Sequence, residues 1–264
     1  MPAPLSNVNW NIILLYYLCH KYCLMKKIIL PLLTLLISTI TIAQKGENIF
    51  GFQFKPIISN KFIGEYERNF DSLPAFHSQS KQKLGYSFGM VMRHYFTDKI
   101  ALETGINFTK RRYNLHFEAN EGGIAETQDL SVGYINYQIP VSALFFIKLS
   151  DELYMNASGG INFDFYPSAV SKSGVIDIDN SFQYRGFRTE WVQFGANANF
   201  GFEYRTKNKG AFYIGATYNQ PFTSTMQFTM AWERKGANTV IRDYINGSYL
   251  TIDLRYFLNV KKNK

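Results

Sequence analysis

Histidine and serine side chains in one short stretch of this 264-residue chain are the first candidates for chemistry. His77 is followed closely by Ser78 and Ser80. A histidine can activate a serine hydroxyl as a nucleophile when the two side chains meet in the fold. Neighbours in sequence form a poor triad, because a triad needs side chains that converge on one another. Together with His116, these residues leave a loop-borne hydrolase open as an alternative function.

Three nearby carboxylates could also do chemistry. Glu65, Glu67 and Asp71 could act as general acids or bases, or bind a cation. Their spacing does not match the calcium-binding loop pattern. The sequence also has no glycine-rich phosphate loop and no cluster of metal ligands. We therefore predict a protein that is not an enzyme, with no catalytic residues, no metal site and no cofactor.

Long β-strands dominate the rest of the chain. Residues 153–166 and 191–205 alternate throughout between apolar side chains and small or polar ones. Such period-two alternation predicts strands, and the 23 Phe and 18 Tyr residues favour strands as well. Ordinary strands have about 5–6 residues, whereas a tilted strand that crosses a membrane needs about 9–11. These lengths indicate membrane-spanning strands.

The spacing of the strands indicates an up-and-down meander. The connections at 97–99, 150–152 and 206–210 are short, and the other four, which alternate with them, are long. In an antiparallel meander all short turns lie at one end, which is typical of outer-membrane barrels. The predicted strands are 48–58, 84–96, 100–114, 133–149, 153–166, 191–205, 211–222 and 247–260, and the predicted long loops are 59–83, 115–132, 167–190 and 223–246. Residues 226–232 also alternate, so ten strands are the alternative.

The polar face of these strands decides which side meets lipid. It carries mainly glycine and amide residues, such as Gly89, Asn107 and Asn197, rather than the lysines and glutamates of a water-exposed surface. Small and amide side chains suit a narrow, filled interior. We therefore predict an all-β fold, an eight-stranded antiparallel up-and-down transmembrane β-barrel. The predicted lipid-facing residues of its closing strand are Leu250, Ile252, Leu254, Tyr256 and Leu258.

Charged residues on the polar face must then neutralise one another inside the barrel. Across the turn at 97–99, pairing Phe96 with Ile100 sets Arg93 opposite Glu103, which indicates an internal ion pair. His94 falls on the outward face near this turn, where a structural role is expected. The predicted charge network of the lumen is Lys55, Arg93, Glu103, Asp164, Glu203, Arg205, Asp253 and Arg255.

The N-terminal region predicts export. Residues 25–43 have two lysines, an apolar run and a final Ala43, the layout of a signal peptide that is cleaved near Ala43. We interpret 1–24 as an upstream extension from a start codon placed too early, and 44–264 as the outer-membrane barrel. Both cysteines, Cys19 and Cys23, precede the predicted cleavage site. The formal net charge of +8 is scattered along the chain, so we expect no nucleic-acid partner.

The strand hairpins resemble a known family. The segments GYSFGMVMRHYFTDKIALETGINFTKR and YINYQIPVSALFFIKLSDELYMNASGG, with the apolar-Pro step Ile139-Pro140 and a leader ending IAQ, resemble the PorT-like small outer-membrane β-barrels of the Bacteroidetes type. The resemblance covers nearly all of residues 44–260. It implies a bacterial outer-membrane location and leaves the activity open.

These patterns predict a non-catalytic outer-membrane barrel. Eight strands enclose a lumen that side chains fill, so function would reside in anchoring or in the long loops. We expect outer-membrane lipid as a partner, the barrel-assembly machinery during biogenesis, and protein partners through loops 59–83 and 223–246. A PorT-like part in protein secretion or assembly is the alternative among binding roles.

Overall fold

The computed structural model describes residues 48–59, 66–69, 76–121, 124–177, 180–234 and 237–258, all within one compact unit, Glu47–Lys264. The predicted extension at 1–24 and signal peptide at 25–43 lie outside the described residues. In the described ranges, no helix is long and apolar enough to cross a membrane.

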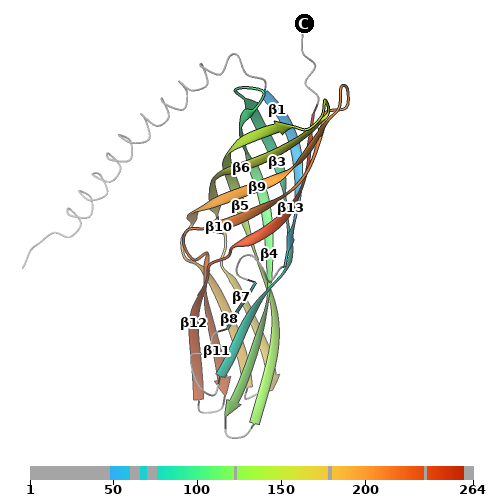
Figure 1. Ribbon diagram of the computed structural model, residues 1–264. Coiled ribbons are helices and arrows are strands. Elements are labelled where there is room, and N and C mark those ends of the chain that lie inside the picture. Colours follow the sequence, from blue (N-terminus) through green and yellow to red (C-terminus); the bar gives the residue numbers. More distant parts are fainter. Residues whose placement is uncertain are drawn as a thin grey trace, which may run out of the picture. The chain divides into compact units, whose positions relative to one another are not determined.

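Eight antiparallel strands close into a ring (Figure 1). Their order is β1-β13-β10-β9-β6-β5-β4-β3, and pairing between β1 and β3 closes it. The eight-stranded up-and-down fold is therefore confirmed. The ring strands are β1 Asn48–Ile58, β3 Phe76–Tyr95, β4 Ile100–Glu121, β5 Ile124–Lys148, β6 Leu153–Phe165, β9 Val192–Arg205, β10 Ala211–Pro221 and β13 Tyr249–Phe257.

Tight turns join three pairs of ring strands at one end. After β3 the Phe96 amide donates to the Ile100 carbonyl over 3.0 Å, and the Thr97 hydroxyl accepts from the Ile100 amide. In the turn after β9, Gly210 adopts a φ of 84°, which favours glycine. The hydrogen bonds in the turn after β3 fix the register between β3 and β4, so Arg93 lies opposite Glu103.

In the segments predicted as long loops, most of the residues that the structure describes lie in strands, so the loop prediction was wrong for them. At 115–132, β4 and β5 continue as one paired hairpin, and at 59–83 the short β2 (Glu67–Asn69) pairs with the start of β3. At 167–190 and 223–246, two hairpins pair into a separate four-stranded sheet of order β12-β11-β8-β7. Its strands are β7 Val170–Asp177, β8 Asn180–Arg188, β11 Met226–Arg234 and β12 Ala237–Ile245. The alternating run at 226–232 is thus a strand outside the ring.

The outer ends of β3, β4 and β5, with β2 and this second sheet, form a structured extension at the end of the barrel opposite the tight turns (Figure 1). It forms because the apolar residues of the long strands change sides: they face outward along the barrel and inward in the extension. On β4 the buried inward side chains are polar from Glu103 to Arg111 and apolar from Tyr113 onward. The buried inward residues are first Glu103, Asn107, Thr109 and Arg111, and then Tyr113, Leu115, Phe117 and Ala119.

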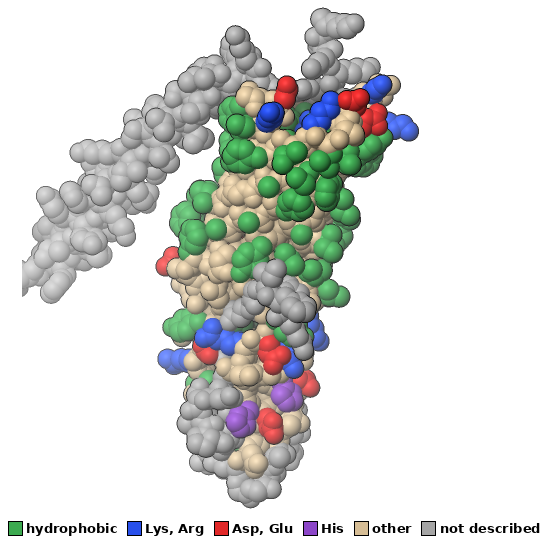
Figure 2. Space-filling model, viewed as in Figure 1, with side chains coloured by type: hydrophobic (Ala, Val, Ile, Leu, Met, Phe, Trp, Pro, Cys, Tyr) green, Lys and Arg blue, Asp and Glu red, His purple; other side chains and the backbone are tan. Residues whose placement is uncertain are grey.

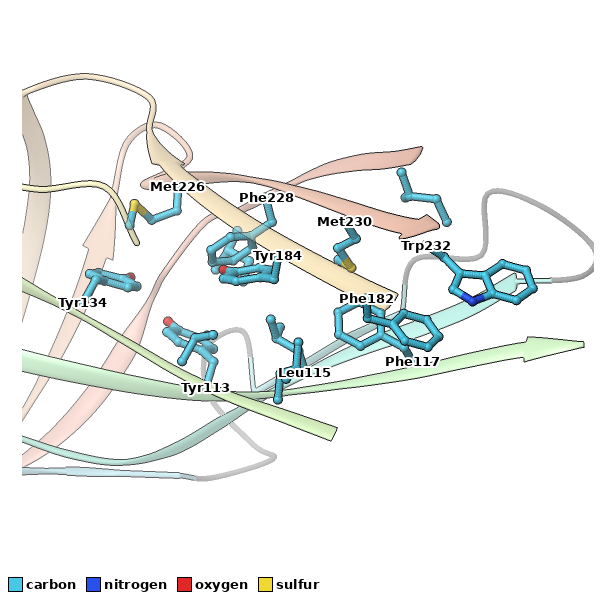
Figure 3. Packing of buried hydrophobic residues seen from close by; sticks show 14 of the residues in the cluster. Tyr113, Leu115, Phe117, Tyr134, Phe182, Tyr184, Met226, Phe228, Met230 and Trp232 are labelled. Atoms are coloured by element: carbon cyan, nitrogen blue, oxygen red, sulfur yellow. The ribbon is translucent and has the colours of Figure 1, made fainter. Parts of the chain in front are cut away.

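An aromatic core fills the extension (Figure 3). Phe117 of β4 stacks on Phe182 of β8 with ring centroids 5.6 Å apart, and Phe182 stacks on Trp232 of β11. Tyr184 and Phe228 pack together in the middle of the cluster, 5.1 Å apart. Burial of these rings explains why the segments fold as strands, since apolar burial offsets the entropy of ordering them.

The outer surface of the ring is apolar (Figure 2). On β4, Leu102 and Ile106 are 37% and 51% exposed, whereas their polar neighbours Glu103 and Asn107 are buried. Side chains such as Phe52, Phe200 and Ile214 continue this apolar belt around the barrel. A barrel wall that is apolar on its outer face and polar on its inner face is typical of a barrel that meets hydrocarbon.

The extension core gives a stability prediction. Replacing Phe117 by alanine should destabilise the extension by about 3–5 kcal/mol, because it leaves a cavity against Phe182. The ring should stay intact, since Phe117 lies beyond it. Hydrogen exchange in micelles measures this as faster exchange of β8 and β11 with unchanged β6 and β9. The matched change Phe88→Ala, on the exposed belt, should leave β8 and β11 protected; equal exchange in both variants would contradict the account.

Candidate functional site

The interior of the barrel holds a connected charge network. Arg93 is fully buried, with Nη2 at 2.8 Å from Glu103 and Nη1 at 2.5 Å from Glu203. Its guanidinium lies 4.0 Å from the centre of the Phe257 ring, which covers it. Each of the two glutamates also contacts a second arginine: Arg255 pairs with Glu103, and Arg205 pairs with Glu203 at 2.7 Å.

Asp253 of β13 extends the same network to the neighbouring strands β1 and β10. It accepts from Arg255 at 2.5 Å and lies 3.4 Å from the Lys55 ammonium. The hydroxyls of Thr217 and Thr251 each donate to it over 2.6 Å. Buried charges need such pairing, because an unpaired charge in a dry interior is very costly.

The structure places seven of the eight predicted charges in one chain of contacts. Asp164, the eighth, is buried elsewhere in the lumen and accepts hydrogen bonds from Asn136 at 2.7 Å and Gln138 at 3.2 Å. Alternation shows only which face a residue lies on, so it grouped Asp164 with the others. Its distance along the strand from the tight turn at 150–152 separates it, because Arg93 and Glu103 lie close to their turn at 97–99.

Arg111 is a buried cation that was not among the predicted lumen charges. It is 1% exposed, and its guanidinium donates to the Tyr113 hydroxyl. The rings of Tyr134 and Tyr249 lie 5.3 and 4.6 Å from it. Counting in steps of two from Glu103 would have found Arg111 on the inward face. It lies where the polar lumen ends and the aromatic core begins.

Amide side chains fill the lumen between the charges. Ser142 donates to Asn197 over 2.8 Å, Asn197 to Asn162 over 2.7 Å, and Asn162 to Asn219 over 2.9 Å. A cavity of about 20 Å³ remains among Gln53, Glu103 and their neighbours. That volume holds about one water molecule. Within the described residues, the lumen is therefore packed rather than open.

The closing strand presents its predicted residues to the outside. Ile252, Leu254 and Leu258 are 41%, 44% and 45% exposed, with Tyr256 beside them and Leu250 half-buried. Tyr256 packs against Phe212 of β10 at 5.0 Å, and its hydroxyl donates to the Lys209 carbonyl in the turn. This strand thus contributes apolar surface to the belt and charge to the lumen.

The residues considered for hydrolysis do not converge. His77 lies on the outer face of β3, whereas Ser78 and Ser80 are buried on the inner face and Ser78 donates to the sulfur of Met230 over 3.0 Å. His116 contacts Asp129 of β5 at 3.0 Å on the exposed face.

The three carboxylates near His77 do not form a site either. Glu67 contacts Lys81 at 3.7 Å and accepts from Gln79. Glu65 and Asp71 lie outside the described residues. The part of the chain that the structure describes has no group of three or more His, Cys, Asp or Glu side chains placed to hold a metal ion.

Comparison with known proteins agrees with this architecture. The model of the outer membrane protein beta-barrel domain family matches residues 46–227, more than half of the chain. The chain belongs to this family. Membership supports a bacterial outer-membrane location, and no curated protein matches the chain.

Solved structures of outer-membrane proteins are similar to the chain. The outer membrane protein OprG from Pseudomonas aeruginosa is 10% identical, with a TM-score of 0.49, over 81% of this chain and 97% of that one. The outer membrane protease OmpT from Escherichia coli is 8% identical, with a TM-score of 0.35, over 80% of this chain and 91% of that one.

The lumen network gives a second stability prediction. Asp253→Asn should cost about 3–5 kcal/mol, because Asp253 is the carboxylate that pairs with buried Lys55 and shares Arg255 with Glu103. Urea unfolding of the chain in lipid vesicles measures the change. Asp151→Asn, which breaks the exposed pair with Lys148, is the matched control and should leave unfolding unchanged. Equal effects from both variants would show that burial of the network is unimportant.

Proposed function

We propose that this chain is a non-catalytic outer-membrane barrel that displays its structured extension outside the cell as an anchored interaction surface. The filled lumen carries the proposal, because side chains and their hydrogen bonds occupy the space that a diffusion channel would need. Outer-membrane barrels have their short turns in the periplasm, which puts the extension on the outer side.

The outer face of the second sheet is the surface we assign to partners. Phe187 of β8 and Tyr244 of β12 lie in one cross-strand row on either side of Gln227, and they are 46% and 45% exposed. Val240, two rows further along, is 52% exposed. Exposed aromatic side chains on a rigid sheet suit protein contact, since little side-chain entropy is lost when they are buried.

Conductance tests the filled lumen. The full chain reconstituted in a planar bilayer should show no stable conductance steps, because the network around Arg93 and the amides close the path. A reproducible ohmic conductance would contradict the proposal.

Cross-linking tests the surface. A photo-cross-linking side chain in place of Tyr244 should form specific adducts in intact cells, and one in place of Lys209, in a turn at the other end, should not give the same adducts. Absence of any adduct from Tyr244 and Phe187 would contradict a role in interaction.

A PorT-like part in secretion is a narrower form of this proposal. It predicts that the protein cross-linked at Tyr244 belongs to an export apparatus. Other captured proteins would leave the interaction role standing and contradict the secretion role. The barrel-assembly machinery is expected as a transient partner on the periplasmic side during insertion.

We further propose that the chain is not a hydrolase. His116 has an acidic neighbour in Asp129, but the serines near His77 face the other side of the strand. The double variant His77→Ala/His116→Ala should therefore leave lipid hydrolysis and peptide hydrolysis by purified protein at the level of the unaltered chain. Loss of a measurable turnover in this variant would contradict the proposal and support the loop-borne hydrolase.

A further inference from the structure

Three cations gather on the outer face of β3 and β4, just beyond the apolar belt. Lys83 lies directly opposite Arg112 in the cross-strand register, and Lys110 lies two residues from Arg112 on the same face. Neighbours of these kinds are about 5–7 Å apart, so the three charges can reach one small anion. We call Lys83, Lys110 and Arg112 the basic triad.

The basic triad has no acidic partner among the residues that the structure describes. Cations close by are paired: Lys81 contacts Glu67 at 3.7 Å, and Arg68 contacts Asp243 at 3.2 Å. Lys83 and Arg112 are exposed, and Lys110 is half-exposed. Three adjacent like charges repel one another, so the triad carries a cost that a bound anion would offset.

An aromatic row lies directly next to the triad on the side of the belt. Tyr86, which is opposite Lys110, packs against Phe88 at 6.3 Å, Phe88 against Phe108 at 5.2 Å, and Phe108 against Tyr137 at 5.8 Å. Aromatic residues concentrate where a membrane meets water. The row thus marks the interface, and the triad lies at headgroup level.

A bulge in β3 joins the two surfaces. The register with β4 shifts between Lys83 and Tyr86, and this leaves both Lys83 and Leu84 exposed side by side. Leu84 is 67% exposed, which is unfavourable in water and favourable in hydrocarbon. Bulges often redirect side chains in this way.

The opposite edge of the belt has a different charge pattern. In two of the tight turns, cations and carboxylates are mixed: Asp98 precedes Lys99, and Lys148 pairs with Asp151 at 2.8 Å. The third turn, 206–210, contains Lys207 and Lys209 and no carboxylate. Figure 2 shows both signs at that end and around the extension as well. The triad differs from these turns because it places three cations next to one another on two paired strands.

We propose that the basic triad binds the phosphate of a phosphorylated lipid in the leaflet next to the extension. Arg112 suits two-point contact with phosphate oxygens, and the two lysines add charge. The acyl chains of the lipid lie along Leu84 and the aromatic row. The lipid thereby fixes the depth of the barrel in the membrane.

A binding titration tests the proposal on the full chain in neutral detergent. Diphosphoryl lipid A is the probe, and lipid A without phosphate is the comparison. The variant Lys83→Gln/Lys110→Gln/Arg112→Gln should bind the diphosphoryl probe on the order of 100-fold more weakly, since each cation near an anionic headgroup contributes about fivefold. Heat-dependent gel migration confirms that the variant is folded.

The matched control removes three lysines at the other end of the barrel, as Lys99→Gln/Lys207→Gln/Lys209→Gln. It should bind the diphosphoryl probe as the unaltered chain does. Three results would overturn the proposal: unchanged binding by the triad variant, an equal loss in the control, or equal affinity of the unaltered chain for both probes. None of these depends on a protein partner of the second sheet.

Discussion

Each long strand of this protein meets hydrocarbon along one part of its outer face and water along the other, and the rest of the structure follows from that constraint. Within the belt, outward residues such as Ile106 are apolar and inward ones such as Asn107 are polar. Beyond Arg111 the order reverses, so the inward side becomes the aromatic core of the extension. The pairing of β4 with β5 keeps one register through both regions, and β3 shifts its register with β4 once, at the bulge between Lys83 and Tyr86. Hydrogen bonding between strands does not depend on which solvent wets a face.

The filled lumen is the consequence inside the membrane. A ring of eight strands leaves room for side chains and little else. Polar side chains there must satisfy one another, which Arg93, Glu103 and Glu203 do through shared contacts. The chain therefore combines a closed barrel with a rigid, β-structured extension, and its surfaces rather than its interior are available for binding.

The sequence predicted the ring well and the extension poorly. Alternation located β1 at its observed bounds, and the turn at 97–99 set Arg93 opposite Glu103, because a tight turn fixes the register locally. Residues 115–132, which we predict as a loop, form the outer part of the β4–β5 hairpin, and their outward side chains, such as His116 and Asp129, are polar. The inward side chains, such as Phe117 and Leu130, are apolar, so these residues do alternate as a strand does. Their apolar side faces inward, whereas the apolar side of the barrel strands faces outward. Alternation alone placed Asp164 with the other lumen charges, whereas its position near the end of β6 Leu153–Phe165, far from the tight turn, separates it from them.

The change of solvent along β4 can be measured directly. Residues 25–264 contain no cysteine, so single spin labels can be placed at Leu102, Ile106, Arg112 and His116 in protein reconstituted in bilayers. The account predicts greater exposure to oxygen than to a water-soluble nickel chelate at Leu102 and Ile106, and the reverse at Arg112 and His116. Greater exposure to the nickel chelate at all four positions would contradict it.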